Sequence, residues 1–245
     1  MSEQDQRIPL AIVTGAAHRL GRGIALALAA QGYAIGLHYH RSREQAVQTA
    51  AEIEALGVAV HLLRADLRQE GEITSMFQAV AALPGVELRV LVNSAGVMDR
   101  GDLRDMPVEE WDSALDLNLR APWLCAREAA RLMHSGGSII NITDSGAHRA
   151  WTGYPAYTVS KAGLESLTRL LARNLAPAVR VNAVAPGLIL RSETVSEEEW
   201  ERLARRIPLQ QPGSLVSITQ AVLFLVENEY ITGQTIVVDG GYQLV

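Results

Sequence analysis

The sequence predicts an α/β protein: a doubly wound sheet of about seven parallel strands with helices on both faces, forming a single domain over residues 1–245. Short apolar runs alternate with helical patterns from end to end, which is typical of a parallel sheet covered on both faces. The predicted strands are apolar without interruption, as strands buried on both faces are. A chain of 245 residues without repeats, linkers or low-complexity tracts fits one large domain.

Three strand–helix pairs are predicted in the first third of the chain. Each begins with an apolar run and continues, through a turn, into a stretch with apolar residues at helical spacing. The first strand closes on Gly15, and Gly32 and Gly57 stop the first two helices, since glycine readily ends a helix. The elements are a strand over 9–15, a helix over 21–31, a strand over 33–39, a helix over 43–56, a strand over 58–63 and a helix over roughly 70–82.

Four further strands are predicted in the rest of the chain. A long helical stretch follows the first of them and is expected to break near Pro107 and Pro122, because proline lacks the N–H that continues a helix. Gly136 and Gly137 turn the chain into the next strand. The elements are strands over 88–93, 138–143, 179–184 and 235–241, with helices over roughly 155–175 and 214–226.

The least regular stretch, residues 187–213, is a candidate substrate lid. It follows a late strand, at the sheet edge where open α/β sheets bind their ligands. Within it, residues 196–207 place Trp200, Leu203 and Ile207 on one face of an amphipathic pattern. This pattern fits either a helix docked on the body of the protein or a flap over a substrate.

Composition excludes several classes of function. With 22 basic and 27 acidic side chains the net charge is −5, which gives no basic field for nucleic acid. No apolar run reaches the roughly 18–20 residues of a membrane span, and the polar N-terminus does not resemble a secretory signal. Cys125 is the only cysteine, which excludes an internal disulfide framework and a cysteine-based zinc site. We expect a cytoplasmic protein with neither nucleic-acid nor membrane partners.

The turn after the first predicted strand, residues 14–21, is a candidate cofactor site. Its small residues let the backbone approach a phosphate, and the start of the following helix attracts an anion. It is the first strand-to-helix turn of a doubly wound pattern, where dinucleotides bind. The turn lacks the G-x-G-x-x-G pattern, so a turn that merely needs glycine is the alternative.

The end of the second predicted strand, from His38 to Ser42, favours NADPH over NADH. An NAD site usually has an acidic residue here to hold the ribose hydroxyl, and none is present. Arg41 can fork onto a 2′-phosphate and Ser42 can donate to it, although a solvated arginine pair is the alternative. His38 and His40 share a strand face, but with no carboxylate or cysteine nearby we interpret them as ordinary strand histidines, and no metal site is predicted.

Two later strand ends carry further polar candidates. Asp66 follows the third predicted strand, and Asn93 to Gly96 follow the fourth. The carboxyl ends of parallel strands meet at one edge, where the adenine and ribose of a dinucleotide would lie. Each could equally be a helix cap or a turn, and only their common edge indicates a site.

The candidate catalytic group is a tyrosine beside the only lysine of the chain. Of the 22 basic residues only Lys161 is a lysine, and a compact ammonium cannot be replaced by arginine near a reacting group. Tyr157 precedes it by four residues, so both lie on one helix face. A nearby cation is expected to lower the pKa of Tyr157 and make it a general acid near neutral pH. Chance retention of one lysine, or a purely structural pair, is the alternative.

A polar strand tip precedes this helix. Asp144 lies thirteen residues before Tyr157 and Ser145 twelve residues before it. A carboxylate or hydroxyl at that tip could face the phenol across a substrate. A loop cap is the alternative for Asp144.

Taken jointly, these motifs resemble the short-chain dehydrogenase/reductase family over roughly residues 8–245. The motifs are T-G-x-x-x-x-x-G at 14–21, N-x-A-G at 93–96, Asn118, Tyr157-x-x-x-Lys161, Pro186-Gly187 and the terminal Asp239-Gly240-Gly241. The resemblance implies a Rossmann fold of seven parallel strands, a nicotinamide cofactor and a homotetramer.

The resemblance also implies roles for individual residues. Tyr157 would donate the proton, Lys161 would hold the nicotinamide ribose and lower the pKa of the phenol, and Asn118 would support a water relay to the lysine. The expected cofactor-binding residues are Gly15, His18, Arg19, Leu20, His40, Arg41, Ser42, Asp66, Leu67, Asn93, Ala95, Gly96, Thr143, Tyr157, Lys161, Pro186, Gly187 and Leu188.

Two departures from the common family pattern are similar to the pteridine reductase branch, which includes dihydromonapterin reductases. Arg19 stands where most of the family have glycine, and Asp144 stands where most have serine. The stretch HYHRS at 38–42 and the run at 173–190 also resemble this branch. In that branch the arginine contacts pyrophosphate and pterin, and the aspartate works with the tyrosine in protonating the pterin ring. The expected substrate residues are Arg19, Met98, Asp144, Ser145 and Tyr157, with Met98 at the place where trypanosomatid relatives stack a phenylalanine on the pterin.

The sequence therefore predicts an NADPH-dependent reductase that transfers hydride to a pterin or dihydropterin. Two alternatives remain open: an NADP-dependent carbonyl or 3-oxoacyl reductase of the same family, and a non-catalytic NADPH-binding sensor or scaffold. The Tyr157 and Lys161 pair argues against the last, because a protein that only binds NADPH has no need of an acid.

Overall fold

In the computed structural model, which describes residues 7–149, 151–192 and 195–245, seven parallel strands form one sheet, as predicted. Their spatial order is β3-β2-β1-β4-β5-β6-β7, so the order reverses between β1 and β4. In such a sheet a crevice opens at the carboxyl ends of the strands beside the reversal. The strands are β1 (Ile8–Val13), β2 (Ala34–Tyr39), β3 (Val60–Arg64), β4 (Val86–Asn93), β5 (Gly137–Ile142), β6 (Val179–Pro186) and β7 (Thr235–Val238).

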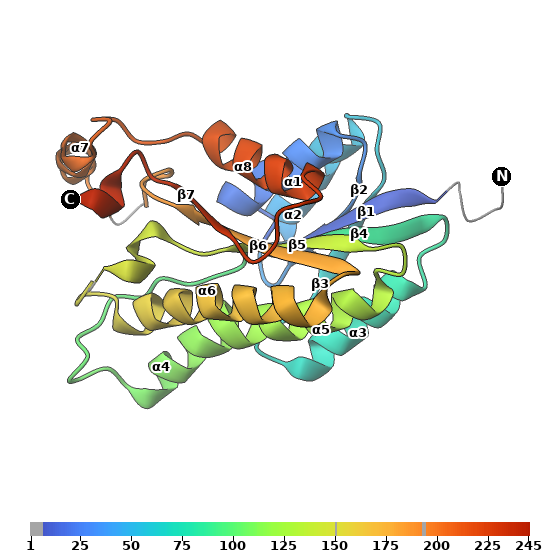
Figure 1. Ribbon diagram of the computed structural model, residues 1–245, viewed down its shortest axis with the longest axis horizontal. Helices are drawn as coiled ribbons and strands as arrows, with labels where there is room; N and C mark the ends of the chain where they lie inside the picture. The colour runs from blue at the N-terminus through green and yellow to red at the C-terminus, as the bar shows by residue number, and fades with distance from the viewer. Residues whose placement is uncertain (1–6, 150, 193–194) are drawn as a thin grey trace.

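Helices cover both faces of the sheet (Figure 1). Two apolar cores result, one on each face, and the interior strands contribute to both. One face carries α1 (Arg19–Ala30), α2 (Arg43–Glu54) and α8 (Leu215–Glu227). The other carries α3 (Glu70–Ala81), α4 (Val108–Leu115), α5 (Ala121–Leu132) and α6 (Pro155–Leu175). Short 3₁₀ turns, η3 (Ser145–His148) and η4 (Tyr242–Leu244), contact each other beyond the sheet.

The predicted helix break at Pro122 is wrong. The chain turns into α4 directly after Pro107, as expected, but it stays helical through a wide π turn, η2 (Asp116–Arg120), into α5. Pro122 lies in the first turn of α5. The wide turn shifts the hydrogen-bonding pattern just before the proline, so its missing N–H leaves the helix intact.

The candidate lid contains a helix, α7 (Glu197–Arg206), anchored at its end. Ile207 is buried, and the N–H of Leu209 donates to the carbonyl of Gly240. This contact favours the docked-helix interpretation for the end of the segment, whereas closure over a substrate stays a prediction. Residues 193–194 of the candidate lid lie outside the described part of the chain. No helix in that described part is long and apolar enough to cross a membrane.

Candidate active site

A cavity of about 700 Å³ opens at the carboxyl ends of β1, β2, β3 and β4, where the strand order reverses. The predicted phosphate turn, the predicted specificity loop and both polar strand ends therefore surround one space. The predicted cofactor residues that line it are Gly15, His18, Arg19, Leu20, His40, Arg41, Ser42, Asp66, Leu67, Ala95 and Gly96.

The turn between β1 and α1 is closed by contacts that only small residues allow. Gly15 has a φ of 65°, and a Cβ there would lie 2.9 Å from the Cα of Ala95. A Cβ on Gly21 would overlap the carbonyl group of Gly15. The hydroxyl of Thr14 accepts hydrogen bonds from the N–H groups of Ser94, at 2.9 Å, and of Ala95, at 3.0 Å. The turn is thereby fastened to the end of β4 and presents the start of α1 to the cavity.

Arg41 and Ser42 lie at the opposite end of the cavity, after β2. Arg41 is exposed and makes no ion pair with any residue that the structure describes. Its guanidinium is thus available to an anion in the cavity. Among the residues that line the cavity, Asp66 is the one with an acidic side chain. One oxygen of Asp66 accepts from the N–H of Arg68 at 3.1 Å, so this carboxylate also caps its own turn.

Arg19 reaches from the phosphate turn to the segment after β6. It adopts a φ of 52°, in the left-handed region that favours glycine. Its guanidinium donates to the carbonyl oxygens of Leu190, at 3.2 Å, and Arg191, at 3.4 Å. Arg19 therefore joins the predicted cofactor turn to the start of the candidate lid, and its contacts with cofactor and substrate stay predictions.

Tyr157, Asp144 and Lys161 form one buried cluster beside the end of β5. The hydroxyl of Tyr157 donates to one oxygen of Asp144 at 2.6 Å, and the N–H of Gly146 donates to the other at 2.7 Å. The ammonium of Lys161 donates to the carbonyl of Ile142 at 2.8 Å and lies 5.7 Å from the centre of the Tyr157 ring. Tyr157 is 9% exposed and Lys161 6%. The loop-cap alternative for Asp144 also holds, since it is the N-cap of η3.

The expected lowering of the Tyr157 pKa is wrong for this arrangement. Burial raises the pKa of Tyr157 well above its ordinary value of 10.0, and the charge and hydrogen bond of Asp144 raise it further. Burial also raises the pKa of Asp144, although the hydrogen bonds from Tyr157 and Gly146 offset part of this increase. The pKa of Lys161 falls from 10.5 to about 8, because burial disfavours its ammonium more than Asp144 favours it.

Asn118 lies fully buried in the π turn next to this cluster. Its side-chain oxygen accepts from the N–H of Val97 at 2.9 Å, and its amide donates to the carbonyl of Val97 and to the hydroxyl of Ser160. These bonds fix the loop after β4. Gly96 lies close to both Asn118 and Lys161, since a Cβ on it would be 3.0 Å from the side-chain oxygen of Asn118 and 3.6 Å from the Lys161 nitrogen. A water relay to the lysine stays a prediction.

Several predicted residues point elsewhere than into the cavity. The side chain of Asn93 turns into the core, where its amide donates to Asn141 at 2.9 Å, so its predicted cofactor contact is not made by the side chain. The hydroxyl of Thr143 is buried and donates to the carbonyl of Val184. Ser145 is buried, with 1% of its surface exposed. Its contact with a substrate stays a prediction.

The strand end after β6 shows why glycine follows Pro186. A Cβ on Gly187 would lie 2.6 Å from the Cβ of Asp239, so this glycine lets β6 and the end of β7 approach. Neither these residues nor Leu188 line the cavity. Met98 is 44% exposed after β4. Their contacts with cofactor or substrate remain predictions.

Residues that the sequence pattern did not single out also line the cavity. Arg68 donates through Nε to the hydroxyl of Ser113 at 2.9 Å, which closes the cavity wall between β3 and α4. His38, interpreted from the sequence as an ordinary strand histidine, is a lining residue as well. Its position at the carboxyl end of a strand beside the phosphate turn was the available signal.

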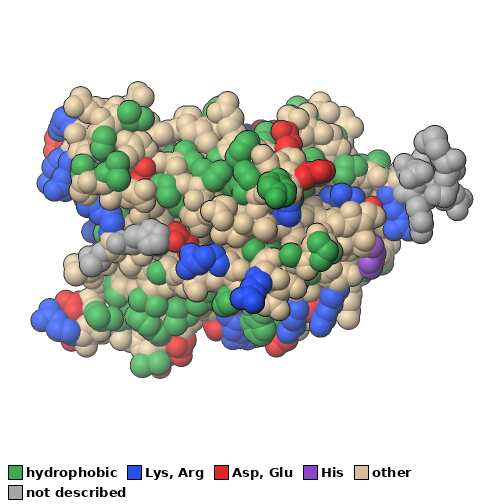
Figure 2. All heavy atoms as spheres, in the orientation of Figure 1, with side chains coloured by type: hydrophobic (Ala, Val, Ile, Leu, Met, Phe, Trp, Pro, Cys, Tyr) green, Lys and Arg blue, Asp and Glu red, His purple; other side chains and the backbone are tan. Residues whose placement is uncertain are grey.

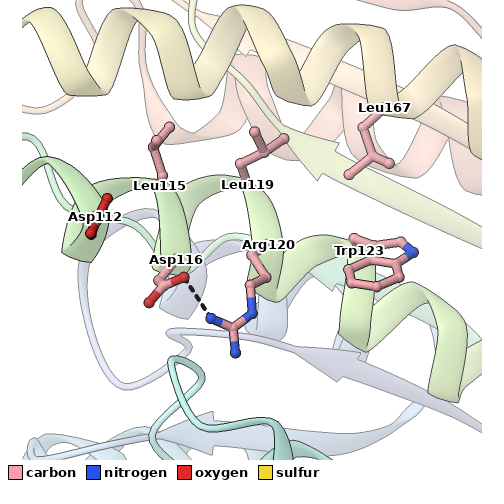
Figure 3. Close-up of a pocket in the computed structure, with 7 residues that line it drawn as sticks. All are labelled: Asp112, Leu115, Asp116, Leu119, Arg120, Trp123 and Leu167. Carbon is pink, nitrogen blue, oxygen red and sulfur yellow. Dashed lines mark hydrogen bonds and ion pairs between the residues drawn. The ribbon is translucent and has the colours of Figure 1, made fainter.

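A second hollow, of about 640 Å³, lies on the outer face of α4, η2, α5 and α6 (Figure 3). Leucines of α4, η2 and α6 and Trp123 of α5 give it an apolar wall, while Asp116 and Arg120 form an ion pair of 2.7 Å at its edge. Figure 2 shows hydrophobic side chains gathered over this side of the molecule. The hollow contains no catalytic group predicted from the sequence.

Residues 15–243 match the family model described as enoyl-(acyl carrier protein) reductase. A 3-oxoacyl-[acyl-carrier-protein] reductase, FabG, of Staphylococcus aureus is 38% identical over 238 residues, which cover 94% of this chain and 96% of that protein. The relatives thus match nearly the full length of the chain.

Two solved structures have a similar overall fold. FolM alternative dihydrofolate reductase 1 from Brucella canis, complexed with NADP, has a TM-score of 0.91 at 31% identity and covers 100% of this chain and 97% of its own. The acetoin dehydrogenase YohF of Salmonella typhimurium has a TM-score of 0.87 at 33% identity, covering 97% of each chain.

Proposed function

Because the chain belongs to the short-chain dehydrogenase/reductase family, whose oxidoreductases use nicotinamide cofactors, we propose that it is an NADPH-dependent reductase. The substrate we propose is a pterin or dihydropterin. Hydride would pass to a C=N carbon of the substrate, and a ring nitrogen would receive the proton. The observation that carries the choice of substrate is the 2.6 Å hydrogen bond between Tyr157 and Asp144.

The cavity fits a dinucleotide phosphate. Because Gly15 and Gly21 leave no room for a Cβ, the backbone itself forms the wall, and an anion can approach the N–H groups at the start of α1. The exposed Arg41 and the neighbouring Ser42 would hold a 2′-phosphate, which supports NADPH over NADH. FolM of Brucella canis, which shares the fold, is described in complex with NADP.

Asp144 supports a substrate that offers hydrogen-bond donors. An ionised carboxylate only accepts hydrogen bonds, so it would repel the negative charge that develops on a ketone oxygen during reduction. A pterin presents N–H groups to such an acceptor. Serine, the common residue at this place in the family, can donate to a ketone oxygen, and aspartate gives up that ability unless it is protonated.

The roles of the catalytic residues follow from their positions. NADPH supplies the hydride when bound. Tyr157 remains a neutral phenol across the physiological pH range, because its pKa is raised, and it therefore holds the proton that the substrate nitrogen receives. Asp144 accepts from Tyr157 and orients the phenol. Lys161, buried and fixed on the carbonyl of Ile142, places a positive charge next to both groups.

A second candidate is an NADP-dependent 3-oxoacyl reductase. The 38% identity to FabG of Staphylococcus aureus favours it, since this similarity exceeds the 31% identity to FolM of Brucella canis. Both candidates share the fold, the cofactor site and the tyrosine–lysine pair. They differ in the chemistry required at position 144.

The two candidates are separated by a substrate panel measured as NADPH consumption. Wild type and Asp144→Ser are tested with dihydrofolate, dihydrobiopterin, dihydromonapterin and a 3-oxoacyl thioester. The pterin proposal predicts turnover of at least one pterin by wild type and its loss, by about a hundredfold or more, in Asp144→Ser. Turnover of the thioester alone, retained or increased in the variant, would establish the second candidate. A Tyr157→Phe variant that matches wild type on every substrate would instead favour the sensor hypothesis.

We also propose that the protein works as a homotetramer in the cytoplasm. The support is the hollow beside Trp123, where an apolar wall with an ion pair at its edge forms a surface that a second copy could cover. Sedimentation analysis of the wild type tests the assembly, and Trp123→Glu is expected to dissociate it. A monomeric wild type would contradict the proposal.

A further inference from the structure

His38 joins three parts of the cavity wall although it lies inside the protein. It is 2% exposed, at the end of β2. The backbone N–H of Gly15 donates to Nδ1 of the ring at 3.0 Å. The other ring nitrogen, Nε2, lies 3.0 Å from the carbonyl oxygen of Ala65, just after β3. One ring therefore connects the phosphate turn with the ends of two neighbouring strands.

The two partners define the protonation of the ring. A carbonyl oxygen only accepts, so Nε2 must carry the hydrogen, and an N–H only donates, so Nδ1 must be bare. His38 is thus a neutral imidazole with a fixed tautomer. Burial lowers its pKa from 6.5 to about 4, although the hydrogen bond to the Ala65 carbonyl offsets part of this decrease. The ring therefore stays neutral at pH values well above 4.

The bond to Gly15 acts on the turn that would bind the cofactor. The N–H of Gly15 is occupied by His38, and the N–H of Ala16 donates to the backbone carbonyl of His38 at 2.9 Å. Both bonds hold the residue at which the chain takes a φ of 65°. The start of α1 is aimed at the cavity only while this turn keeps its shape.

We infer that His38 is a positioning residue for the cofactor: its bare Nδ1 fixes the phosphate turn at Gly15, and its Nε2–H fixes that turn to the end of β3. The inference rests on the proposed NADPH site and extends it, because His38 presents its ring to protein groups and acts through the turn. Loss of the Gly15 bond is expected to weaken NADPH binding and raise the KM for NADPH, with little change in kcat at saturating cofactor.

Two substitutions separate the two bonds. In His38→Asn the side-chain oxygen occupies roughly the place of Nδ1 and can still accept from Gly15. In His38→Gln the longer amide reaches toward the place of Nε2 and can donate to Ala65, whereas His38→Leu keeps neither bond. A buried N–H left without a partner is costly, so we expect NADPH binding to weaken by roughly tenfold or more in His38→Gln and His38→Leu. His38→Asn is expected to stay within about threefold of wild type.

The measurement is a fluorescence titration with NADPH, together with KM and kcat for each variant. His61→Asn is the matched control, because this histidine lies on the adjacent strand β3 and does not line the cavity. Comparing His38→Asn with His38→Gln keeps the test decisive even when His38→Leu fails to fold. Equal NADPH affinity in these two variants would overturn the inference, as would a change confined to kcat. A wild-type protein that binds NADPH in neither assay would overturn the proposed function itself.

Discussion

Acidification is expected to destabilise the protein through His38. The pKa of this buried ring is lowered from 6.5 to about 4 in the folded chain. Between those values the unfolded chain binds a proton that the folded chain does not, so protons favour unfolding. The contribution of the neutral ring is therefore fully present above pH 6.5 or so and is lost progressively as the pH falls toward about 4.

The size of this effect follows from the same two values. One pKa unit corresponds to about 1.4 kcal/mol, so the free energy of unfolding falls by about 3 kcal/mol once the pH lies below both pKa values. Most of this change occurs in an accessible range, since about 2 kcal/mol is lost between roughly pH 7 and pH 5. A loss of that size is a large fraction of the stability of a typical domain.

The assay is urea unfolding at fixed protein concentration, followed by far-UV circular dichroism from about pH 7 to pH 5. Wild type is compared with His38→Asn, in which no group titrates at this position. Carboxylates such as Glu87, whose pKa is lowered by its hydrogen bonds to Ser135, also cost stability in acid. They are present in both proteins and cancel in the difference. Parallel curves for the two proteins would refute the reasoning, because they would show that His38 titrates normally or remains neutral in both states.

Three further predictions test the cofactor and catalytic ends. Gly21→Ala is expected to raise the KM for NADPH about tenfold or more, because its Cβ would overlap the carbonyl of Gly15; Gly71→Ala, where a Cβ meets nothing within 4 Å, serves as control. Arg41→Glu is expected to shift the ratio of kcat/KM for NADPH over NADH by about tenfold or more toward NADH, and an unchanged ratio would contradict the role of Arg41. Activity is expected to decline as the pH rises through about 8, where Lys161 loses its proton, so a flat pH–rate profile there would contradict the need for its charge.

The fold was predictable because its signals are local and repeated. Seven apolar runs separated by helical patterns admit few arrangements other than a parallel sheet covered on both faces. The break expected at Pro122 failed for a specific reason: the preceding π turn widens the helix just where the proline would otherwise interrupt it. Nothing in the residues of a short window shows that such a turn will form, because it depends on the surrounding helices.

The candidate site was predictable where it depends on backbone and on position along a strand. The phosphate turn and the Arg41 loop follow from small or charged residues at strand ends, and both line the cavity. His38 was not recognised, since its partners are the backbone N–H of Gly15 and the carbonyl of Ala65, which the sequence does not mark. Only the approach of three strand ends turns an unremarkable strand histidine into a link between them.

The direction of the Tyr157 pKa was also beyond the sequence, and its reversal bears on the choice of substrate. A spacing of four residues places Lys161 on the same helix face, but burial and the carboxylate of Asp144 raise the pKa of Tyr157. Tyr157 donates to Asp144, so it can donate to a substrate only when that bond is exchanged. A ketone would then leave the Asp144 oxygen that faces Tyr157 without a donor, at a cost of about 1–3 kcal/mol, or roughly 5- to 150-fold in rate. A pterin N–H can take the place of the phenol on Asp144, which makes the exchange nearly neutral and gives aspartate an advantage over serine for this class of substrate alone.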